Sequence, residues 1–185
     1  IILHQIPSGI LTEKCKCIMG NGMVIDPTDL VKELNMLTEN NIVYKDYIHI
    51  SPHAHIVTPI HKCIDSRVEE ISKQRIGTTC RGIGPAYVDK YNRCGIRALD
   101  LHNVESLENK VMEKLNIAIK NSELTLEDRE FLIPQIKEFL NDASEISSMV
   151  SDTFGMLHKM ADGNNNILLE GAQGTMLDIN HGTYP

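Results

Sequence analysis

The chain has 185 residues, of which 42% are hydrophobic and 23% charged, and its formal net charge is −7. This length and composition are typical of a globular domain with a sizeable core. The acidic balance argues against a general nucleic-acid binder, and no apolar run approaches the ~18 residues of a membrane-spanning helix.

Cysteine usage and the first residues give two further expectations. Five cysteines without the spacing of a disulfide scaffold favour a reducing, cytoplasmic setting. No signal peptide is visible, and the chain opens at Ile1 with strand-like residues. We therefore interpret the chain as an internal piece of a longer protein.

The first fifty residues read as short strands around one helix. Apolar runs bounded by turn residues predict strands at 1–6, 15–19, 23–25 and 48–51. Asp26 followed by Pro27 is typical of a helix N-terminus, and Asn40 marks the expected end. Cys15 and Cys17 could form half of a metal site, but no second pair lies at zinc spacing, so core packing is the preferred interpretation.

A cluster of histidines offers an alternative metal site. His53, His55, His61 and Cys63 could together bind Zn²⁺ or a transition metal. A helix starting near Pro52 would place His53 and His55 on different faces, which disfavours chelation, so no metal is predicted. The helix is expected to continue from 60 to 73, with an apolar stripe made of Ile60, Ile64, Val68 and Ile71.

The stretch 76–97, IGTTCRGIGPAYVDKYNRCGIR, carries the strongest functional pattern. Lys73 to Arg97 contains six Lys/Arg and one Asp, a local charge of +5 that leaves −12 for the rest of the chain. Paired threonines and several glycines precede Pro85, which suits the first turn of a short helix over 85–91. A basic, glycine-rich loop on an acidic protein indicates a site for a small anion, most simply a phosphate; the alternative is a solvated surface loop.

Residues 101–162 read as helices without chemistry. Leu107, Val111, Leu115 and Ile119 lie four apart, as on one face of a helix. Thr125 with Asp128 resembles a capping box that opens a second helix, which Pro134 should break or kink. A third helix is expected from 146 to 160, closed by Gly163.

A last strand is predicted at 167–169, followed by the segment Glu170-Gly171-Ala172-Gln173-Gly174. In α/β folds, ligands bind beyond the carboxyl ends of strands. The Gln173 amide can both donate and accept hydrogen bonds, which suits a purine edge or a sugar hydroxyl. A simple strand-to-loop turn is the alternative.

Three blocks of the sequence resemble one known family. The stretch GIGPAYVDKYNR resembles the adenylosuccinate synthetase signature G-I-G-P-x-Y-x-x-K-x-x-R, with matches at Gly82, Ile83, Gly84, Pro85, Tyr87, Lys90 and Arg93. The block 170–185, EGAQGTMLDINHGTYP, is also similar, as are 4–10 and 19–26 near the start. Cys80 stands where a glycine is common in the family.

The resemblance implies a fold and a reaction. The fold is α/β, a mixed and mainly parallel sheet of the P-loop-like adenylosuccinate synthetase type. Residues 1–185 would be the central part of a single domain, with a helical insertion at about 101–162. The implied enzyme is a cytoplasmic, homodimeric, GTP- and Mg²⁺-dependent ligase that joins IMP and L-aspartate to give adenylosuccinate, GDP and phosphate.

The resemblance also assigns residues. Thr79 and Gln173 are implied to bind IMP, and Arg93 to reach the IMP phosphate of the neighbouring subunit. Gly82, Gly84, Pro85 and Lys90 belong to the signature. The family's G-D-E-G-K-G-K loop, catalytic Asp and catalytic His match nothing in this chain, so no catalytic residue is assigned, Mg²⁺ is expected to be bound mainly by residues outside it, and the isolated chain should be inactive. A nucleotide- or phosphate-binding module without catalysis is the alternative.

Overall fold

The computed structural model describes residues 1–12, 14–71 and 77–183, and within them it shows an α/β architecture. The strands are β1 (Cys17–Met19), β2 (Val24–Ile25), β3 (Ile48–Ile50) and β4 (His55–Ile56). The α-helices are α1 (Pro27–Glu39), α2 (Pro59–Ile71), α3 (Ile83–Tyr91), α4 (Val104–Lys120), α5 (Leu126–Ile146) and α6 (Thr153–Asp162). Four 3₁₀ turns join them: η1 (Ser8–Leu11), η2 (Ala98–His102), η3 (Ser147–Met149) and η4 (Thr175–Leu177).

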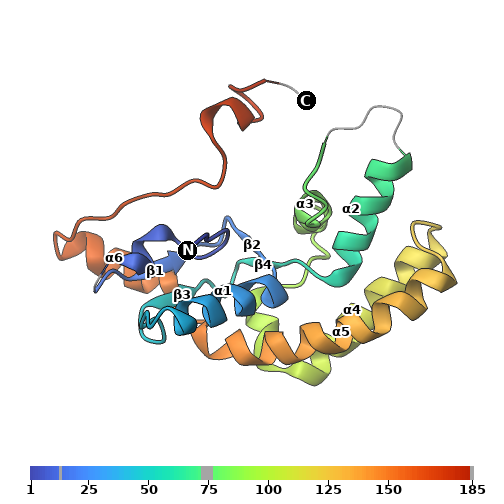
Figure 1. Ribbon diagram of the computed structural model, residues 1–185, viewed down its shortest axis with the longest axis horizontal. Coiled ribbons are helices and arrows are strands. Elements are labelled where there is room, and N and C mark those ends of the chain that lie inside the picture. The colour runs from blue at the N-terminus through green and yellow to red at the C-terminus, as the bar shows by residue number, and fades with distance from the viewer. Residues whose placement is uncertain (13, 72–76, 184–185) are drawn as a thin grey trace.

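Two parallel strand pairs form the centre of the fold (Figure 1). β1 pairs with β3, so that Cys17 lies opposite Ile48, and β2 pairs with β4. Side chains from three of the strands are completely buried, as expected for parallel strands covered on both faces: Met19, Ile25 and Ile50. The predicted α/β class with parallel pairing is confirmed.

The predicted helix that starts at Asp26 is α1. The Asp26 carboxylate accepts hydrogen bonds from the backbone N–H groups of Thr28 (3.0 Å) and Asp29 (3.3 Å). These bonds satisfy amide groups that have no partner within the helix. Asn40 caps the other end, and a buried stripe of Leu30, Leu34 and Leu37 faces the core.

The predicted strand at 1–6 is wrong. The Glu33 carboxylate, only 4% exposed, accepts hydrogen bonds from the backbone N–H groups of His4, Gln5 and Ile6 at 3.0 Å each. The Gln5 side chain in turn bonds to both backbone groups of Asp26. These amides are therefore held by α1 rather than by a neighbouring strand.

The helix expected near Pro52 is also wrong, because β4 occupies that region and α2 begins only at Pro59. The backbone N–H groups of His55 and Val57 donate to the carbonyls of Met23 and Ile25, which draws the segment into the sheet. Along α2, Ile60 is buried as predicted, but Val68 is 60% exposed. The side chain of Ile71 and the predicted continuation to 73 lie outside the described residues.

Helices α4 and α5 lie along one another (Figure 1), and α4 buries the predicted leucine–valine stripe. The capping box of α5 is confirmed: Asp128 N–H donates to Thr125 Oγ1, and Thr125 N–H donates to the Asp128 carboxylate. Pro134 does not break α5. Pro134 is exposed, as is Glu130, whose carbonyl loses its helical partner because proline has no N–H.

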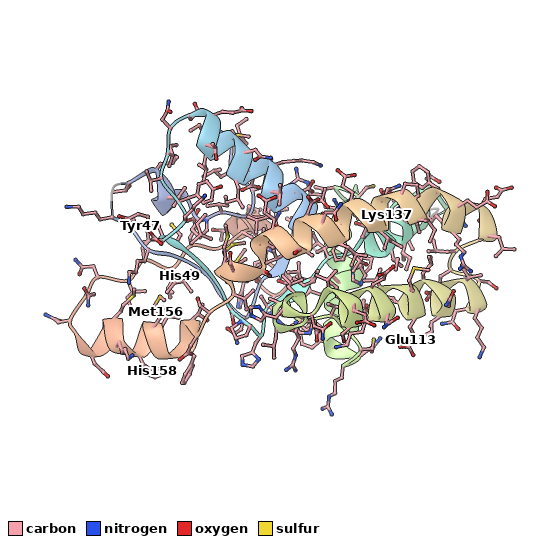
Figure 2. The ribbon with its side chains drawn as sticks, turned by 90° about the horizontal axis from the view of Figure 1, so that it is seen from below. Tyr47, His49, Glu113, Lys137, Met156 and His158 are labelled. Carbon is pink, nitrogen blue, oxygen red and sulfur yellow. The ribbon has the colours of Figure 1, made fainter. Side chains whose placement is uncertain are left out.

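The third predicted helix, 146–160, is not continuous, because α5 ends at Ile146 and α6 begins only at Thr153. Val150 forms a parallel bridge with Ile50, and the Ser151 N–H donates to the Ile50 carbonyl at 3.0 Å. This contact with β3 separates the end of α5 from α6, which ends at Gly163 as predicted. Figure 2 shows α6, with Met156 and His158, on the same side of the molecule as Tyr47 and His49, whereas Glu113 and Lys137 mark α4 and α5.

The predicted buried strand at 167–169 is wrong. Leu168 and Leu169 are 89% and 90% exposed, and the segment runs away from the sheet (Figure 1). Among the described residues, β3 pairs with β1 on one edge and bridges Val150 on the other, and residues 167–169 join neither strand. Within the same residues, no helix is long and apolar enough to cross a membrane.

Candidate functional site

Helix α3 carries the basic signature, and Gly82 fixes where it begins. Gly82 has a φ of 74°, and its N–H donates to the Asp65 carboxylate of α2 at 2.9 Å. A Cβ at this position would lie 2.7 Å from the backbone nitrogen of Lys62 and 2.8 Å from the carbonyl carbon of His61. Only glycine therefore allows the loop to lie against α2. The helix starts at Ile83, two residues before the predicted start, with Pro85 in its first turn.

Three contacts hold α3 against the strand region. Ala86 is 1% exposed and packs with Val24 and Val57. The Tyr87 hydroxyl donates to the Gly22 carbonyl at 2.8 Å, and Lys90 Nζ donates to the Asn21 carbonyl at 3.0 Å. Lys90 thus fastens α3 to a turn, in addition to the electrostatic role expected for it.

Arg93 closes α3 in a left-handed conformation. Its φ is 61°, its N–H donates to the Lys90 carbonyl, and the Cys94 N–H donates to the Asp89 carbonyl. This pair of bonds is a Schellman motif, in which glycine is usual at the position that Arg93 occupies. Arg93 is exposed, and within residues 1–12, 14–71 and 77–183 its guanidinium makes no ion pair.

The same closing motif recurs at three other helix ends, with Asn41 after α1, Ser122 after α4 and Asn164 after α6. Asparagine tolerates the left-handed region, whereas arginine is poorly suited to it. Arg93 is thus a cation of the basic stretch that is held in a backbone conformation that costs free energy. The turn projects Arg93 at the end of α3, beside no described acidic partner.

Thr79 lies in the exposed loop that leads into α3. The loop is shaped locally: the Gly77 N–H donates to Glu69 Oε1 at 2.8 Å, and the Cys80 N–H donates to Thr78 Oγ1 at 3.4 Å. Cys80, where the family commonly has glycine, adopts a left-handed φ of 52°. Among the described residues the Thr79 hydroxyl forms no hydrogen bond.

A buried polar network beneath α3 is absent from the sequence-based predictions. His61 Nδ1 accepts the Thr58 N–H at 2.9 Å, so the ring proton lies on Nε2, which contacts the Asp89 carboxylate at 2.8 Å. Lys114 of α4 forms an ion pair with the same carboxylate. Burial, followed by the charge of Lys114, lowers the pKa of His61 to about 3. The one signal in the sequence was Asp89 itself, the only acid in a basic stretch.

The histidine cluster does not form a metal site. Both ring nitrogens of His61 are engaged within the protein, His53 is exposed and His55 is buried. In the part of the chain that the structure describes, no group of three His, Cys, Asp or Glu side chains is placed to hold a metal ion. These residues therefore do not fit a resident Mg²⁺ or Zn²⁺.

A polar hollow lies between α1, α2 and α5, away from the predicted site. Its volume is about 300 Å³, and it is lined by Asp26, Thr28, Lys32, Pro59, Lys62, Gln135 and Glu138. Lys62 forms ion pairs with Asp26 and with Asp29 across it. Although burial lowers the Lys62 pKa, its two carboxylate partners outweigh this effect, so the pKa is raised overall. The lining charges already neutralise one another, which makes this hollow a poor anion site.

Gln173 is not brought to α3 by any hydrogen bond of the described residues. It is exposed in the segment that precedes η4. The contact of this segment with the body of the fold is at Glu170, whose carboxylate accepts hydrogen bonds from the N–H and the hydroxyl of Ser8, both at 3.1 Å. Of the predicted site residues, the structure therefore places Thr79 and Arg93 at opposite ends of one helix and Gln173 on a separate segment.

Comparison with known proteins gives a uniform result. The sequence model of the adenylosuccinate synthetase family matches residues 1–185. An adenylosuccinate synthetase from Thermodesulfovibrio yellowstonii is 42% identical over 189 residues, which cover 100% of this chain and 43% of that protein. Another from Chlorobium phaeobacteroides is 44% identical with the same coverage.

A solved structure agrees with the sequence relatives. The fully ligated adenylosuccinate synthetase from Plasmodium falciparum matches with a TM-score of 0.84 and 34% identity. The match covers 99% of this chain and 42% of that one. The chain thus spans less than half of the length of these relatives.

Proposed function

Because the chain belongs to the adenylosuccinate synthetase family, we propose that it supplies the IMP-binding and dimer-forming part of a GTP-dependent carbon–nitrogen ligase. The complete cytoplasmic enzyme joins IMP and L-aspartate and releases adenylosuccinate, GDP and phosphate. Thr79 and Gln173 bind IMP, and Arg93 reaches the IMP phosphate of the neighbouring subunit in a homodimer. Membranes and nucleic acid have no part in this proposal.

The observation that carries this proposal is the conformation of Arg93. An exposed guanidinium without a described acidic partner is held in a left-handed turn at the end of a helix fixed to α2 and to the strand region. A guanidinium binds phosphate through two parallel hydrogen bonds, a geometry that a lysine ammonium lacks. A rigid helix that projects such a group suits a phosphate on another molecule.

The reaction sets limits on what this chain contributes. Transfer of the γ-phosphoryl group of GTP to the purine 6-oxygen requires charge neutralisation and proton transfer. We assign no acid or base of this chain to those steps. The Mg²⁺ that accompanies GTP is assigned mainly to residues outside this chain, as the family resemblance implies.

The proposal is tested in the full-length protein that contains this chain. We expect it to form adenylosuccinate from IMP, aspartate and GTP, and Arg93→Leu to raise the KM for IMP with little change in the KM for GTP. Arg129→Leu, which removes an arginine from α5, is the matched control and should leave both constants unchanged.

Two outcomes would overturn the proposal in different ways. A full-length protein that binds IMP but forms no adenylosuccinate would favour a nucleotide-binding module without catalysis. Adenylosuccinate formation by the isolated 185-residue chain would show that the catalytic groups had been wrongly placed outside it.

A further inference from the structure

Asp89 joins three helices at one carboxylate. It belongs to α3, its Oδ2 atom lies 2.8 Å from His61 Nε2 of α2, and the same atom forms an ion pair with Lys114 of α4. The side chains of His61, Asp89 and Lys114 are 2%, 15% and 18% exposed. The sequence analysis expects no chemical role for the helical region after residue 101. The structure shows that this region supplies a cation, Lys114, that contacts Asp89 within the basic signature.

The bond from His61 does not neutralise Asp89. Because His61 Nδ1 accepts the Thr58 N–H, the imidazole is neutral and contributes only its Nε2 proton. Lys114 is therefore the group that balances the charge of Asp89. Without it, a negative charge of low exposure would lie next to Lys90 in sequence and four residues before Arg93.

We propose that Lys114 is a positioning residue for the anion-binding end of α3, which it serves by balancing the charge of Asp89. The inference rests on the proposed binding of the IMP phosphate by Arg93. An uncompensated Asp89 competes with the phosphate for the guanidinium and lowers the local positive potential. Lys114 itself does not contact the ligand.

The role differs from simple stabilisation of the fold, because α3 has other attachments. Gly82 bonds to Asp65, Ala86 is buried, and Tyr87 bonds to Gly22. With these contacts intact, loss of Lys114 leaves α3 in place and changes chiefly its electrostatic potential. One unbalanced unit charge on α3, four residues before Arg93 in sequence, should raise the KM for IMP roughly fivefold.

The test uses the full-length enzyme and separates the KM values for IMP and GTP. Lys114→Met should raise the KM for IMP and leave the KM for GTP within about twofold. Lys110→Met is the matched control, since Lys110 of the same helix pairs with Asp100 at 2.6 Å but is 47% exposed. It should change neither constant.

A double variant distinguishes charge balance from packing. Asp89→Asn keeps an oxygen for the His61 N–H but removes the negative charge, so Lys114→Met/Asp89→Asn should return the KM for IMP toward the wild-type value. If Lys114→Met lowers only thermal stability, or if the double variant binds IMP as poorly as the single one, the positioning role is wrong. A wild-type enzyme that forms no adenylosuccinate would instead refute the proposed function.

Discussion

Replacement of Arg93 by glycine should make the protein more stable and less able to use IMP. The left-handed region costs a residue with a Cβ about 1–2 kcal/mol relative to its usual conformations. Glycine loses more entropy on folding, which offsets about 0.4–1 kcal/mol of that gain. Since Arg93 has a φ of 61°, Arg93→Gly should raise the free energy of unfolding by up to about 1.6 kcal/mol.

The same change removes the guanidinium. Hydrogen bonds to charged groups contribute about 1.5–3 kcal/mol, which corresponds to a rise in the KM for IMP of about 10- to 150-fold. Ser122→Gly provides a matched control, because Ser122 also has a φ of 61° in the same closing motif but lies after α4. It should give a similar gain in stability without any change in the KM for IMP.

The assay compares thermal or denaturant midpoints of the full-length variants with their KM values for IMP and GTP. Arg93→Gly is expected to raise the unfolding midpoint and also to raise the KM for IMP. Ser122→Gly is expected to raise the midpoint alone. If Arg93→Gly lowers stability, or leaves the KM for IMP unchanged, the interpretation of this strained turn as a functional feature is refuted.

Three further predictions concern other parts of the chain. Glu33→Gln should lower the free energy of unfolding by about 3 kcal/mol, because it disrupts charged hydrogen bonds to residues 4–6, whereas Glu39→Gln at the exposed end of α1 should have little effect in the same denaturation assay. His61 has an ordinary pKa of 6.5 and a folded pKa of about 3, so between these pH values it binds a proton only in the unfolded state. The free energy of unfolding should therefore fall as the pH is lowered from 6.5 towards 3. An equally steep pH dependence in His61→Gln would exclude the titration of His61 as the cause. Gln173→Ala should raise the KM for IMP by about 2- to 12-fold without loss of stability, and unchanged IMP kinetics would return Gln173 to the simple turn interpretation.

Features that depend on near neighbours in sequence could be predicted. The Asp26 cap, the Thr125–Asp128 capping box and the leucine–valine stripe of α4 each involve residues a few positions apart, and the structure confirms all three. The short helix of the signature was also predicted, within two residues of its start. Caps and apolar periodicity are local properties, so the sequence states them directly.

Features that depend on distant partners could not be predicted. The amides of residues 4–6 bind Glu33, nearly thirty positions away, and Val150 pairs with Ile50, a hundred positions away. The network of His61, Asp89 and Lys114 likewise joins three helices. A short stretch of sequence does not show which distant residue it will pair with. For this reason the predictions of strands at 1–6 and 167–169, and of one continuous third helix from 146 to 160, were wrong.

The most direct test of the proposed site asks whether Arg93 serves its own subunit or the neighbouring one. Full-length Arg93→Leu subunits are mixed with subunits that carry only Thr79→Val, and adenylosuccinate formation is measured. If Arg93 acts across the dimer, each mixed dimer has one site with both lesions and one with neither, so equal mixing should restore about a quarter of wild-type activity. If mixed dimers form but activity stays at the level of the two parent variants, Arg93 does not reach the neighbouring IMP, and the account is contradicted.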